Sequence, residues 1–255
     1  MKGWVLITGA SAGIGLELAG LIAADGFNLI LVARRQDVLR TLADRLQAQH
    51  GIEVKVLAKD LSQRPAASEI LAELGSTPIS ILVNNAGFGW FGPFAEETTA
   101  EALDMMQVNM GALVELTRLI LPAMQARGAG RILNVASTAA FQPGPFAAVY
   151  YATKAFVLSF SCALAEELAG TGITVTALCP GATQTEFFQR AGGAGPIARR
   201  VPMMAAGQVA RAGYRGLMRG SRVVIPGMLN RITATAAKLL PGRLITKIAS
   251  KLNKP

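Results

Sequence analysis

The sequence predicts an α/β protein with a doubly wound parallel sheet of about seven strands and helices on both faces. Short apolar segments alternate along the chain with longer segments of helical periodicity, at the spacing of βαβ units. The first apolar segment leads through a glycine-containing turn into a helical pattern. The stretch around residues 173–179 is continuously apolar, which is typical of parallel strands covered on both faces.

The predicted strands and helices follow one another along the whole chain. The helix after the second strand carries Leu39, Leu42 and Leu46, and two long helical patterns cover residues 99–127 and 149–169. A sheet of this kind binds its ligand at the carboxyl ends of the strands. We expect these strands at residues 2–8, 28–33, 53–58, 79–84, 130–137, 173–179 and 222–226.

Composition excludes several classes of protein. A chain of 255 residues with 51% hydrophobic and 16% charged residues is not disordered, and it is long enough for one large core. Cys162 and Cys179 are too few for a disulfide framework and lack metal-site spacing, so we expect reduced cysteines, no metal and a cytoplasmic location. The chain enters its first strand at once and its apolar runs are short, so we expect neither a signal peptide nor a membrane span.

The net charge of +9 is concentrated at the carboxyl end. From residue 190 onward there are 13 Lys or Arg and no Asp or Glu, so the other 12 basic and 16 acidic residues give residues 1–189 a net charge of −4. Tyr214 is the only aromatic residue after Phe188, whereas nucleic-acid binders interleave aromatic and basic side chains. We therefore expect no nucleic-acid partner.

A glycine-rich turn follows the first strand. Its spacing is G-x-x-x-G-x-G, and it contains Gly9, Ser11, Gly13, Ile14 and Gly15. Glycine permits positive φ and close approach there, so backbone N–H groups and the positive end of the next helix would face a diphosphate. Because the common fingerprint is G-x-G-x-x-G, the segment is either a phosphate-binding loop or a tight turn.

Polar residues gather at the carboxyl ends of the later strands. Asn-Asn-Ala-Gly at 84–87 ends the fourth strand, Ser137 ends the fifth, and Asn109 lies in the helical pattern between them. Tyr150 follows Ser137 by 13 residues and precedes Lys154 by four. That spacing places Tyr150 and Lys154 on one face of a helix, one turn apart.

The Tyr150 and Lys154 pair predicts acid–base chemistry. The ammonium favours the phenolate and would lower a pKa that starts near ~10, which makes the phenol an acid and a base near neutral pH. Ser137 can donate to the reacting oxygen and stabilise the charge that develops there. Tyr151 projects about 100° away, so we select Tyr150; the alternative is a structural helix tyrosine.

Together these motifs resemble the short-chain dehydrogenase/reductase family over residues 1–190, in the order that the family has them. The resemblance implies a Rossmann fold, a nicotinamide dinucleotide and hydride transfer between a carbonyl and a secondary alcohol. It implies that Tyr150 moves the proton, that Ser137 polarises the substrate oxygen, and that Lys154 also holds the nicotinamide ribose. It further implies that Asn109 positions a water in a proton relay with Lys154.

The end of the second strand predicts which cofactor binds. Arg34 and Arg35 stand there, and no acidic residue occurs before Asp37. A carboxylate would take the ribose 2′-hydroxyl of NAD, whereas guanidinium groups bind the 2′-phosphate of NADP. The sequence therefore predicts NADP(H), preferred over NAD(H), although the glycine turn lacks the basic residue that some NADP-preferring relatives have.

The resemblance implies further cofactor contacts. Asp60 and Leu61, after the third strand, would lie at the adenine, although Asp60 equally suits the start of a helix. Asn85, Ala86 and Gly87 would line the adenine-ribose side, unless they form a plain loop. The turn after the sixth strand would meet the nicotinamide carboxamide and the diphosphate, or it is a simple strand-end turn; it contains Pro180, Gly181, Thr183 and Thr185.

Large apolar side chains predict a pocket for a hydrophobic carbonyl or alcohol. They lie in residues 89–94, in 142–146 and from Phe187 onward. Alternatively, Phe94 and Phe146 support contacts between subunits. Similar proteins associate through their two long helices, so we expect a homodimer or homotetramer.

The resemblance also suggests how the single domain is divided. Residues 1–190 would form the cofactor-binding and catalytic core, 186–220 a region over the substrate, and 227–255 a basic helical tail. Within the second region, the Gly- and Ala-rich stretch 191–195 is either a substrate lid or an ordinary surface loop.

The carboxyl tail predicts a basic amphipathic helix over residues 242–254. Such a helix packs against a neighbour, lies on an anionic membrane surface, or docks an acidic carrier protein. If this helix lies on a membrane surface, the protein would be cytoplasmic with peripheral membrane contact. The basic side chains recur at intervals of four, four and three residues beside an apolar face, as Arg243, Lys247, Lys251 and Lys254 beside Leu244, Ile245, Ile248 and Leu252.

These observations predict an NADP(H)-dependent oxidoreductase that interconverts a hydrophobic ketone and a secondary alcohol. The strand-end motifs are similar to those of steroid and long-chain 3-oxoacyl reductases, which makes a 3-oxoacyl-thioester reductase of lipid metabolism the rival enzyme. A non-catalytic NADP(H)-binding sensor or scaffold is the rival of another class. The presence of Ser137, Tyr150 and Lys154 together favours an enzyme.

Overall fold

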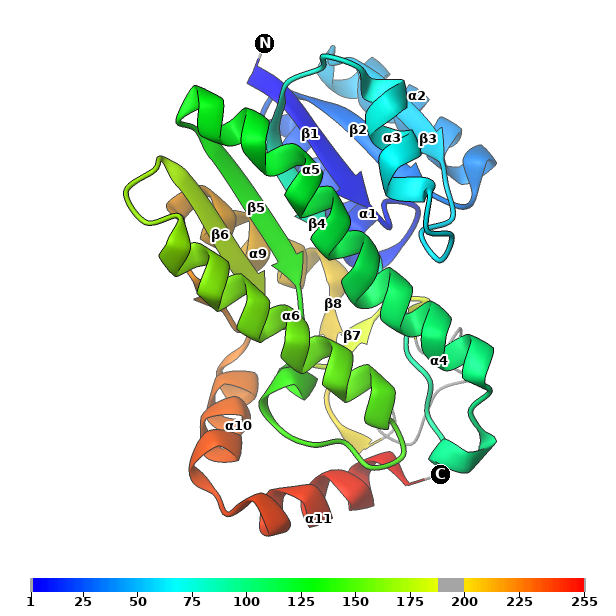
Figure 1. Ribbon diagram of the computed structural model, residues 1–255, viewed down its shortest axis with the longest axis vertical. Coiled ribbons are helices and arrows are strands. Elements are labelled where there is room, and N and C mark those ends of the chain that lie inside the picture. The colour runs from blue at the N-terminus through cyan, green and yellow to red at the C-terminus, as the bar shows by residue number, and fades with distance from the viewer. Residues whose placement is uncertain (1, 188–199, 255) are drawn as a thin grey trace.

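Seven parallel strands form the central sheet in the order β3-β2-β1-β4-β5-β6-β9 (Figure 1). The computed structural model describes residues 2–187 and 200–254 of the chain. The strand order reverses between β1 and β4, which is where an open parallel sheet forms its ligand crevice. The strands are β1 Lys2–Thr8, β2 Phe27–Ala33, β3 Val54–Ala58, β4 Ile79–Asn84, β5 Gly130–Val135, β6 Ile173–Leu178 and β9 Val223–Val224.

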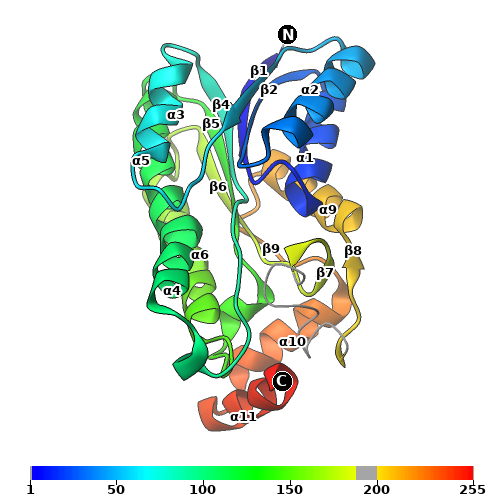
Figure 2. The same cartoon turned by 90° about the vertical axis from the view of Figure 1, so that its right-hand side faces the viewer.

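Helices cover both faces of the sheet, as the sequence predicts (Figure 2). One face is covered by α1 Gly13–Ala24, α2 Gln36–His50 and α9 Ala206–Arg219. The other face is covered by α3 Ala66–Leu74, α5 Ala112–Arg127 and α6 Ala148–Glu167, with α4 Thr99–Met106 beyond the end of α5. Two short 3₁₀ turns, η1 Phe94–Glu96 and η3 Thr138–Phe141, lie in loops.

Alternate residues of each strand enter opposite cores, which explains why the strands are continuously apolar. In β1, Val5 and Ile7 pack with the helices α1, α2 and α9, whereas Leu6 packs with α3 and α5. All three side chains are fully buried. A strand that fills two cores has no face left for polar residues.

Some boundaries differ from the predicted ones. The helix expected over 99–127 is interrupted by a π-turn, η2 Gln107–Gly111, which holds the buried Asn109. Strand β5 ends at Val135, so Ser137 lies two residues beyond it, and the strand expected over 222–226 has only two paired residues.

The carboxyl part of the chain adds elements beside the sheet. Strand β7 Thr183–Gln184 pairs with β8 Met204–Ala205 in a separate parallel ladder. Two helices follow β9, α10 Met228–Leu239 and α11 Gly242–Asn253. The predicted amphipathic helix near the carboxyl end is therefore present as α11, whereas residues 191–195, the candidate lid, lie outside the described residues.

One helix, α6, has the length and hydropathy of a membrane-spanning segment, contrary to the expectation that no stretch reaches this length. A core helix that packs against a sheet can meet the same criterion. The buried side chains of Tyr150, Lys154 and Val157 show that α6 is such a core helix.

A buried polar network joins the centre of the sheet to the helices on one face. Asn84 Nδ2 donates to Asn134 Oδ1 at 2.9 Å and to Thr117 Oγ1 at 3.1 Å, and Asn134 Nδ2 donates to Ser161 Oγ at 2.9 Å. The network links β4 and β5 to α5 and α6, so it fixes how the helix that carries Tyr150 sits on the sheet.

Replacing Asn134 with Ala should lower the free energy of unfolding by about 1–3 kcal/mol, because buried partners on two elements lose their hydrogen bonds. Urea unfolding measures this loss. The matched control is Thr176→Val on the neighbouring strand β6, where the buried Oγ1 has no hydrogen-bond partner among the described residues. This variant should be neutral or more stable, and equal destabilisation by both variants would contradict the role of the network.

Candidate active site

The glycine turn joins β1 to α1 at the point where the strand order reverses. Gly9 and Gly13 have φ values of +66° and +55°, which L side chains rarely adopt. Ala12, at the start of α1, makes no side-chain cap. The first backbone N–H groups of α1 therefore stay available to a ligand. The sequence expectation of a strand, a turn and a helix is confirmed.

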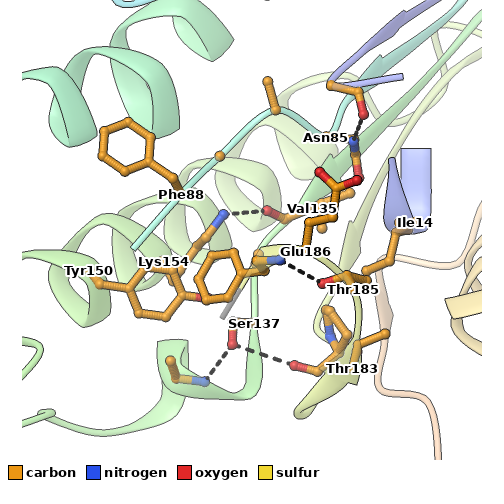
Figure 3. A pocket seen from close by; sticks show the side chains of 18 of the residues that line it. Ile14, Asn85, Phe88, Val135, Ser137, Tyr150, Lys154, Thr183, Thr185 and Glu186 are labelled. Atoms are coloured by element: carbon orange, nitrogen blue, oxygen red, sulfur yellow. Dashed lines mark hydrogen bonds between the residues drawn. The ribbon is translucent and has the colours of Figure 1, made fainter. Parts of the chain in front are cut away.

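Thr8 and Asn85 fasten this turn to the end of β4. Thr8 Oγ1 accepts hydrogen bonds from the backbone N–H groups of Asn85 and Ala86, both at 3.0 Å. Asn85 Nδ2 donates to the carbonyls of Thr8 at 2.9 Å and Gly9 at 3.1 Å (Figure 3). The second Asn of the 84–87 segment therefore braces the turn, while Asn84 points into the core.

Arg35 spans the entrance of the site at the end of β2. Its Nη2 forms an ion pair with Glu186 Oε2 at 3.0 Å and donates to the backbone and hydroxyl oxygens of Ser11, both at 3.2 Å. Arg34 is more exposed and lies 4.0 Å from Asp60. The Arg35 guanidinium thus lies beside the glycine turn and that of Arg34 beside Asp60, and sequence reasoning missed the carboxylate of Glu186.

Asp60 caps a turn rather than a helix. Its Oδ1 accepts a hydrogen bond from Ser62 N at 3.0 Å, and the nearest helix, α3, begins only at Ala66. Leu61 is buried and lines the same cavity.

Ser137 and Tyr150 meet at the carboxyl edge of the sheet. Ser137 Oγ accepts from Ala139 N at 3.1 Å and donates to the Pro180 carbonyl at 3.4 Å, which fixes it at the start of η3 (Figure 3). Tyr150 lines the same cavity as Ser137, and the Ser137 side chain acts to lower the pKa of its phenol. Its ring is enclosed by Phe187, at 5.3 Å between centroids, and by other rings.

The pKa of Tyr150 is shifted in the direction opposite to the expected one. Burial raises it well above its usual value, and the Ser137 side chain offsets only part of that rise. Lys154 Nζ donates to the Val135 carbonyl at 3.0 Å and lies 5.9 Å from the Tyr150 ring centroid. Burial lowers the pKa of Lys154 to about 8. The expected lowering of the phenol pKa by Lys154 is therefore wrong for this structure, because loss of hydration dominates both groups.

Asn109 holds helix α6 and the loop after β4 together. Its Oδ1 accepts from Phe88 N, and its Nδ2 donates to the Phe88 carbonyl and to Thr153 Oγ1, all at 3.0 Å. Thr153 Oγ1 in turn donates to the Tyr150 carbonyl at 2.7 Å. A Cβ at Gly87 would lie 3.0 Å from Asn109 Oδ1 and 3.2 Å from Lys154 Nζ, so both side chains reach the same backbone.

The turn after β6 closes over the glycine turn. Thr183 Oγ1 donates to the Gly181 carbonyl at 2.9 Å, and Thr185 Oγ1 accepts from Phe187 N at 3.2 Å. The Thr185 methyl group lies against Gly13. The segment thus reaches from the glycine turn to the aromatic wall around Tyr150.

A single cavity of about 810 Å³ joins these parts. Two of the predicted site residues do not line it: Gly15 packs beneath the turn against the Gly9 carbonyl, and Asn109 is engaged with Phe88 and Thr153. The predicted residues that do line it are Gly9, Ser11, Gly13, Ile14, Arg34, Arg35, Asp60, Leu61, Asn85, Ala86, Gly87, Ser137, Tyr150, Lys154, Pro180, Gly181, Thr183 and Thr185.

The apolar end of the cavity is only partly as expected. Phe91, Gln142 and Phe187 line it, and the two expected loops touch where Gly92 N donates to the Phe146 carbonyl at 2.9 Å. Phe94, in contrast, is 66% exposed and does not line the cavity.

Sequence reasoning missed the two carboxyl-terminal helices as walls of the cavity. Leu229 and Thr233 of α10 and Leu252 of α11 line it. The end of α11 is held by Asn253, which accepts from the Tyr151 hydroxyl at 3.3 Å and donates to the Pro145 carbonyl at 3.0 Å. Asn253 is fully buried, which only the tertiary structure shows, so the sequence carried no signal for this docking.

The strand order, the glycine turn at its reversal and the Ser, Tyr and Lys side chains define a dinucleotide-binding fold with an acid–base site. The family model for short chain dehydrogenase matches residues 3–194. The chain belongs to the short-chain dehydrogenase family, whose members are nicotinamide-dependent oxidoreductases. Among the described residues, no group of three His, Cys, Asp or Glu side chains is placed to hold a metal ion.

Known proteins resemble this chain over different lengths. A ketoacyl reductase, HetN, of Nostoc sp. is 37% identical over 69% of this chain and 62% of its own length. A very-long-chain 3-oxoacyl-CoA reductase of Phaeosphaeria nodorum is 40% identical over 68% and 52%. The chain thus spans little more than half the length of these relatives. The structure of a short-chain dehydrogenase from Sphingobium yanoikuyae in complex with NADPH has a TM-score of 0.84 and 36% identity, covering 92% of both chains.

Replacing Lys154 with Met should raise stability at neutral pH by about 1–3 kcal/mol, because a buried ammonium is removed. The pKa of Lys154 is about 8 in the folded chain, against 10.5 for an ordinary lysine. Below pH 8 the wild type therefore carries the full cost of the buried charge. As the pH rises from about 8 to about 10.5, only the unfolded chain still binds the proton, so the stability of the wild type rises toward that of the variant.

Urea unfolding of the wild type and of Lys154→Met, at about pH 7 and about pH 10, measures the difference between their free energies of unfolding. Lys247→Met, which removes an exposed lysine of α11, is the matched control. Its difference from the wild type in free energy of unfolding should not become smaller as the pH rises. A difference between wild type and Lys154→Met that stays constant over this range would show that Lys154 keeps its proton.

Proposed function

We propose that this chain is an NADP(H)-dependent oxidoreductase that interconverts a hydrophobic ketone and a secondary alcohol. The observation that carries the proposal is the convergence of Ser137, Tyr150 and Lys154 in the cavity that also contains the glycine turn. A nucleotide sensor or scaffold would need only the turn, so the acid–base group favours an enzyme.

The site residues fit a nicotinamide dinucleotide. The turn at Gly9 and Gly13, with the uncapped start of α1, would hold the diphosphate, and Lys154 would hold the nicotinamide ribose. Arg35 Nε is buried and has no hydrogen-bond partner among the described residues, which suits an anionic group at that point. The bound nicotinamide supplies or accepts the hydride.

The side chains of the site act on the substrate oxygen. Ser137 can donate a hydrogen bond to this oxygen and stabilise its developing charge. Tyr150 stays protonated through neutral pH because burial raises its pKa, so it can donate a proton to the alkoxide. The protonated phenol is the form that reduction of a carbonyl uses. Lys154 places its charge near the ring, 5.9 Å from the centroid, and Asn109 holds Tyr150 in position through Thr153.

The arginines at the end of β2 support NADP(H) over NAD(H). Arg34 and Arg35 both line the cavity, and no carboxylate follows them until Asp37. Glu186 pairs with Arg35 at 3.0 Å, so a 2′-phosphate would have to displace this carboxylate to bind the guanidinium group.

Replacing Tyr150 with Phe should lower kcat for carbonyl reduction by about 10²–10⁴-fold, because the proton donor is lost. NADPH binding should persist, since the glycine turn and the arginines are unchanged. Steady-state assays with a screen of bulky hydrophobic ketones measure the activity, and fluorescence titration measures the binding.

The control is Tyr151→Phe. It removes the neighbouring phenol, whose hydroxyl donates to Asn253 and not to Ser137. It should keep most of its activity. A Tyr150→Phe protein as active as wild type would contradict the assigned chemistry.

Replacing Arg34 and Arg35 with Ala should weaken NADPH binding by about 10- to 100-fold and leave NADH binding nearly unchanged, because only the 2′-phosphate loses its partners. Energy transfer from the protein tryptophans to the nicotinamide reports both affinities. Arg40→Ala, at an exposed position of α2, is the control. Equal loss for both nucleotides would contradict NADP(H) preference, and binding of neither by the wild type would contradict the dinucleotide site.

A 3-oxoacyl-thioester reductase of lipid metabolism is the second candidate. Its support is the similarity to a very-long-chain 3-oxoacyl-CoA reductase, and an apolar cavity end that reaches α10 and α11. Comparing kcat/KM for a 3-oxoacyl thioester with that for the free ketone separates the two candidates. A preference for the thioester that is lost when Arg243, Lys247 and Lys251 become Glu favours the second.

We also propose that the chain acts in the cytoplasm as a homodimer or homotetramer. The absence of a disulfide between Cys162 and Cys179 suits a reducing compartment. Exposed apolar side chains on the helices of one face suit subunit contacts, as Leu119 on α5 and Phe156 on α6 are 38% and 40% exposed.

A further inference from the structure

Helix α10 turns an apolar row toward solvent. Met228, Ile232 and Leu239 are 71%, 58% and 80% exposed, and their spacing places them on one side of the helix. The opposite side is buried through Ala234 and Ala237. A helix of a soluble protein normally exposes its polar side, so this reversed pattern marks an interaction surface.

The next helix, α11, carries a basic row. Arg243, Lys247 and Lys251 are exposed, at intervals of four residues, and Leu244 and Ile248 next to them are 47% and 41% exposed. The chain contains no Asp or Glu after residue 190, so this part of the sequence supplies no acidic partner for these cations. Apolar side chains flanked by long basic ones suit the boundary between acyl chains and anionic headgroups.

The two helices lie together at one end of the molecule, beyond the carboxyl ends of the strands (Figures 1 and 2). They also form walls of the active-site cavity. Leu229 lines the cavity and is at the same time 56% exposed, and Leu252 of α11 lines it too. The outer apolar surface is therefore continuous with the apolar end of the site.

We propose that α10 and α11 dock this protein on an anionic lipid bilayer, so that a hydrophobic substrate passes from the lipid into the cavity past Leu229. The docking surface consists of Met228, Ile232, Leu239, Leu240, Arg243, Leu244, Lys247, Ile248 and Lys251. The docking itself does not depend on the proposed catalysis, whereas the passage of a substrate rests on the proposed function.

Charge and apolarity together favour lipid over other occupants. A second copy of the same surface would bring like charges together, since every charged residue on the exposed side of α11 is basic. An acidic protein would pair with the lysines but would not need the row of Met228, Ile232 and Leu239. An anionic bilayer can bury the apolar row of α10 and bind the basic row of α11 at the same time. Each exposed Lys or Arg near its surface strengthens binding.

Vesicle flotation of the full chain tests the proposal without any turnover. The wild type should float with phosphatidylcholine vesicles that contain phosphatidylserine, and not with pure phosphatidylcholine vesicles. Lys247→Glu with Lys251→Glu, and separately Ile232→Ser with Leu239→Ser, should each reduce the apparent affinity for anionic vesicles by at least about fivefold. None of these four side chains lines the cavity, so reduction of a water-soluble ketone should be unchanged.

The matched control is Arg40→Glu with Arg45→Glu on α2, at the opposite end of the molecule, which makes the same change in net charge (Figure 1). It should keep its binding to anionic vesicles. Three results would overturn the proposal. The first is no flotation of the wild type. The second is a loss of vesicle binding in the lysine variant only, because the apolar row would then not enter the bilayer. The third is conversion of a dimer to a monomer by Ile232→Ser with Leu239→Ser on size exclusion.

Discussion

The site depends on the hydrogen bonds that join β1 to β4 where the strand order reverses. Thr8 and Asn85 tie the two strand ends together and fix the glycine turn from behind. The same segment continues to Phe88, whose backbone is held by Asn109. Asn109 bonds Thr153, and Thr153 bonds the backbone of Tyr150. The turn that would hold the diphosphate and the residue that would move the proton are thus positioned by one connected network.

Burial shifts the pKa values of the Tyr150 and Lys154 side chains in opposite directions. The Tyr150 phenol and the Lys154 ammonium both lose hydration, which favours their neutral forms, raising the pKa of the first and lowering that of the second. The apolar wall that encloses Tyr150 therefore keeps it a proton donor at neutral pH. Shape and protonation state have a common cause here, because the rings of Phe91 and Phe187 both bound the cavity and dehydrate the phenol.

The carboxyl-terminal helices are part of the site and of the surface at once. Asn253 is fully buried and anchors the end of α11 to Tyr151 and to the Pro145 carbonyl. Arg200 adds hydrogen bonds to the last carbonyls of α11, at 2.6 Å for Lys251. This anchoring leaves the other side of α11 free to present its lysines, so a single helix both bounds the cavity and faces outward.

The sequence by itself determined the seven-stranded sheet, the glycine turn and the shared helix face of Tyr150 and Lys154. These features depend on periodicity and on neighbours within a few residues, where hydrophobic spacing and glycine leave few alternatives. Only the tertiary structure decided the direction of the pKa shifts, the ion pair of Arg35 with Glu186, and the docking of α11 through Asn253. Each of these arises between residues that are distant in the chain, so no local pattern encodes it.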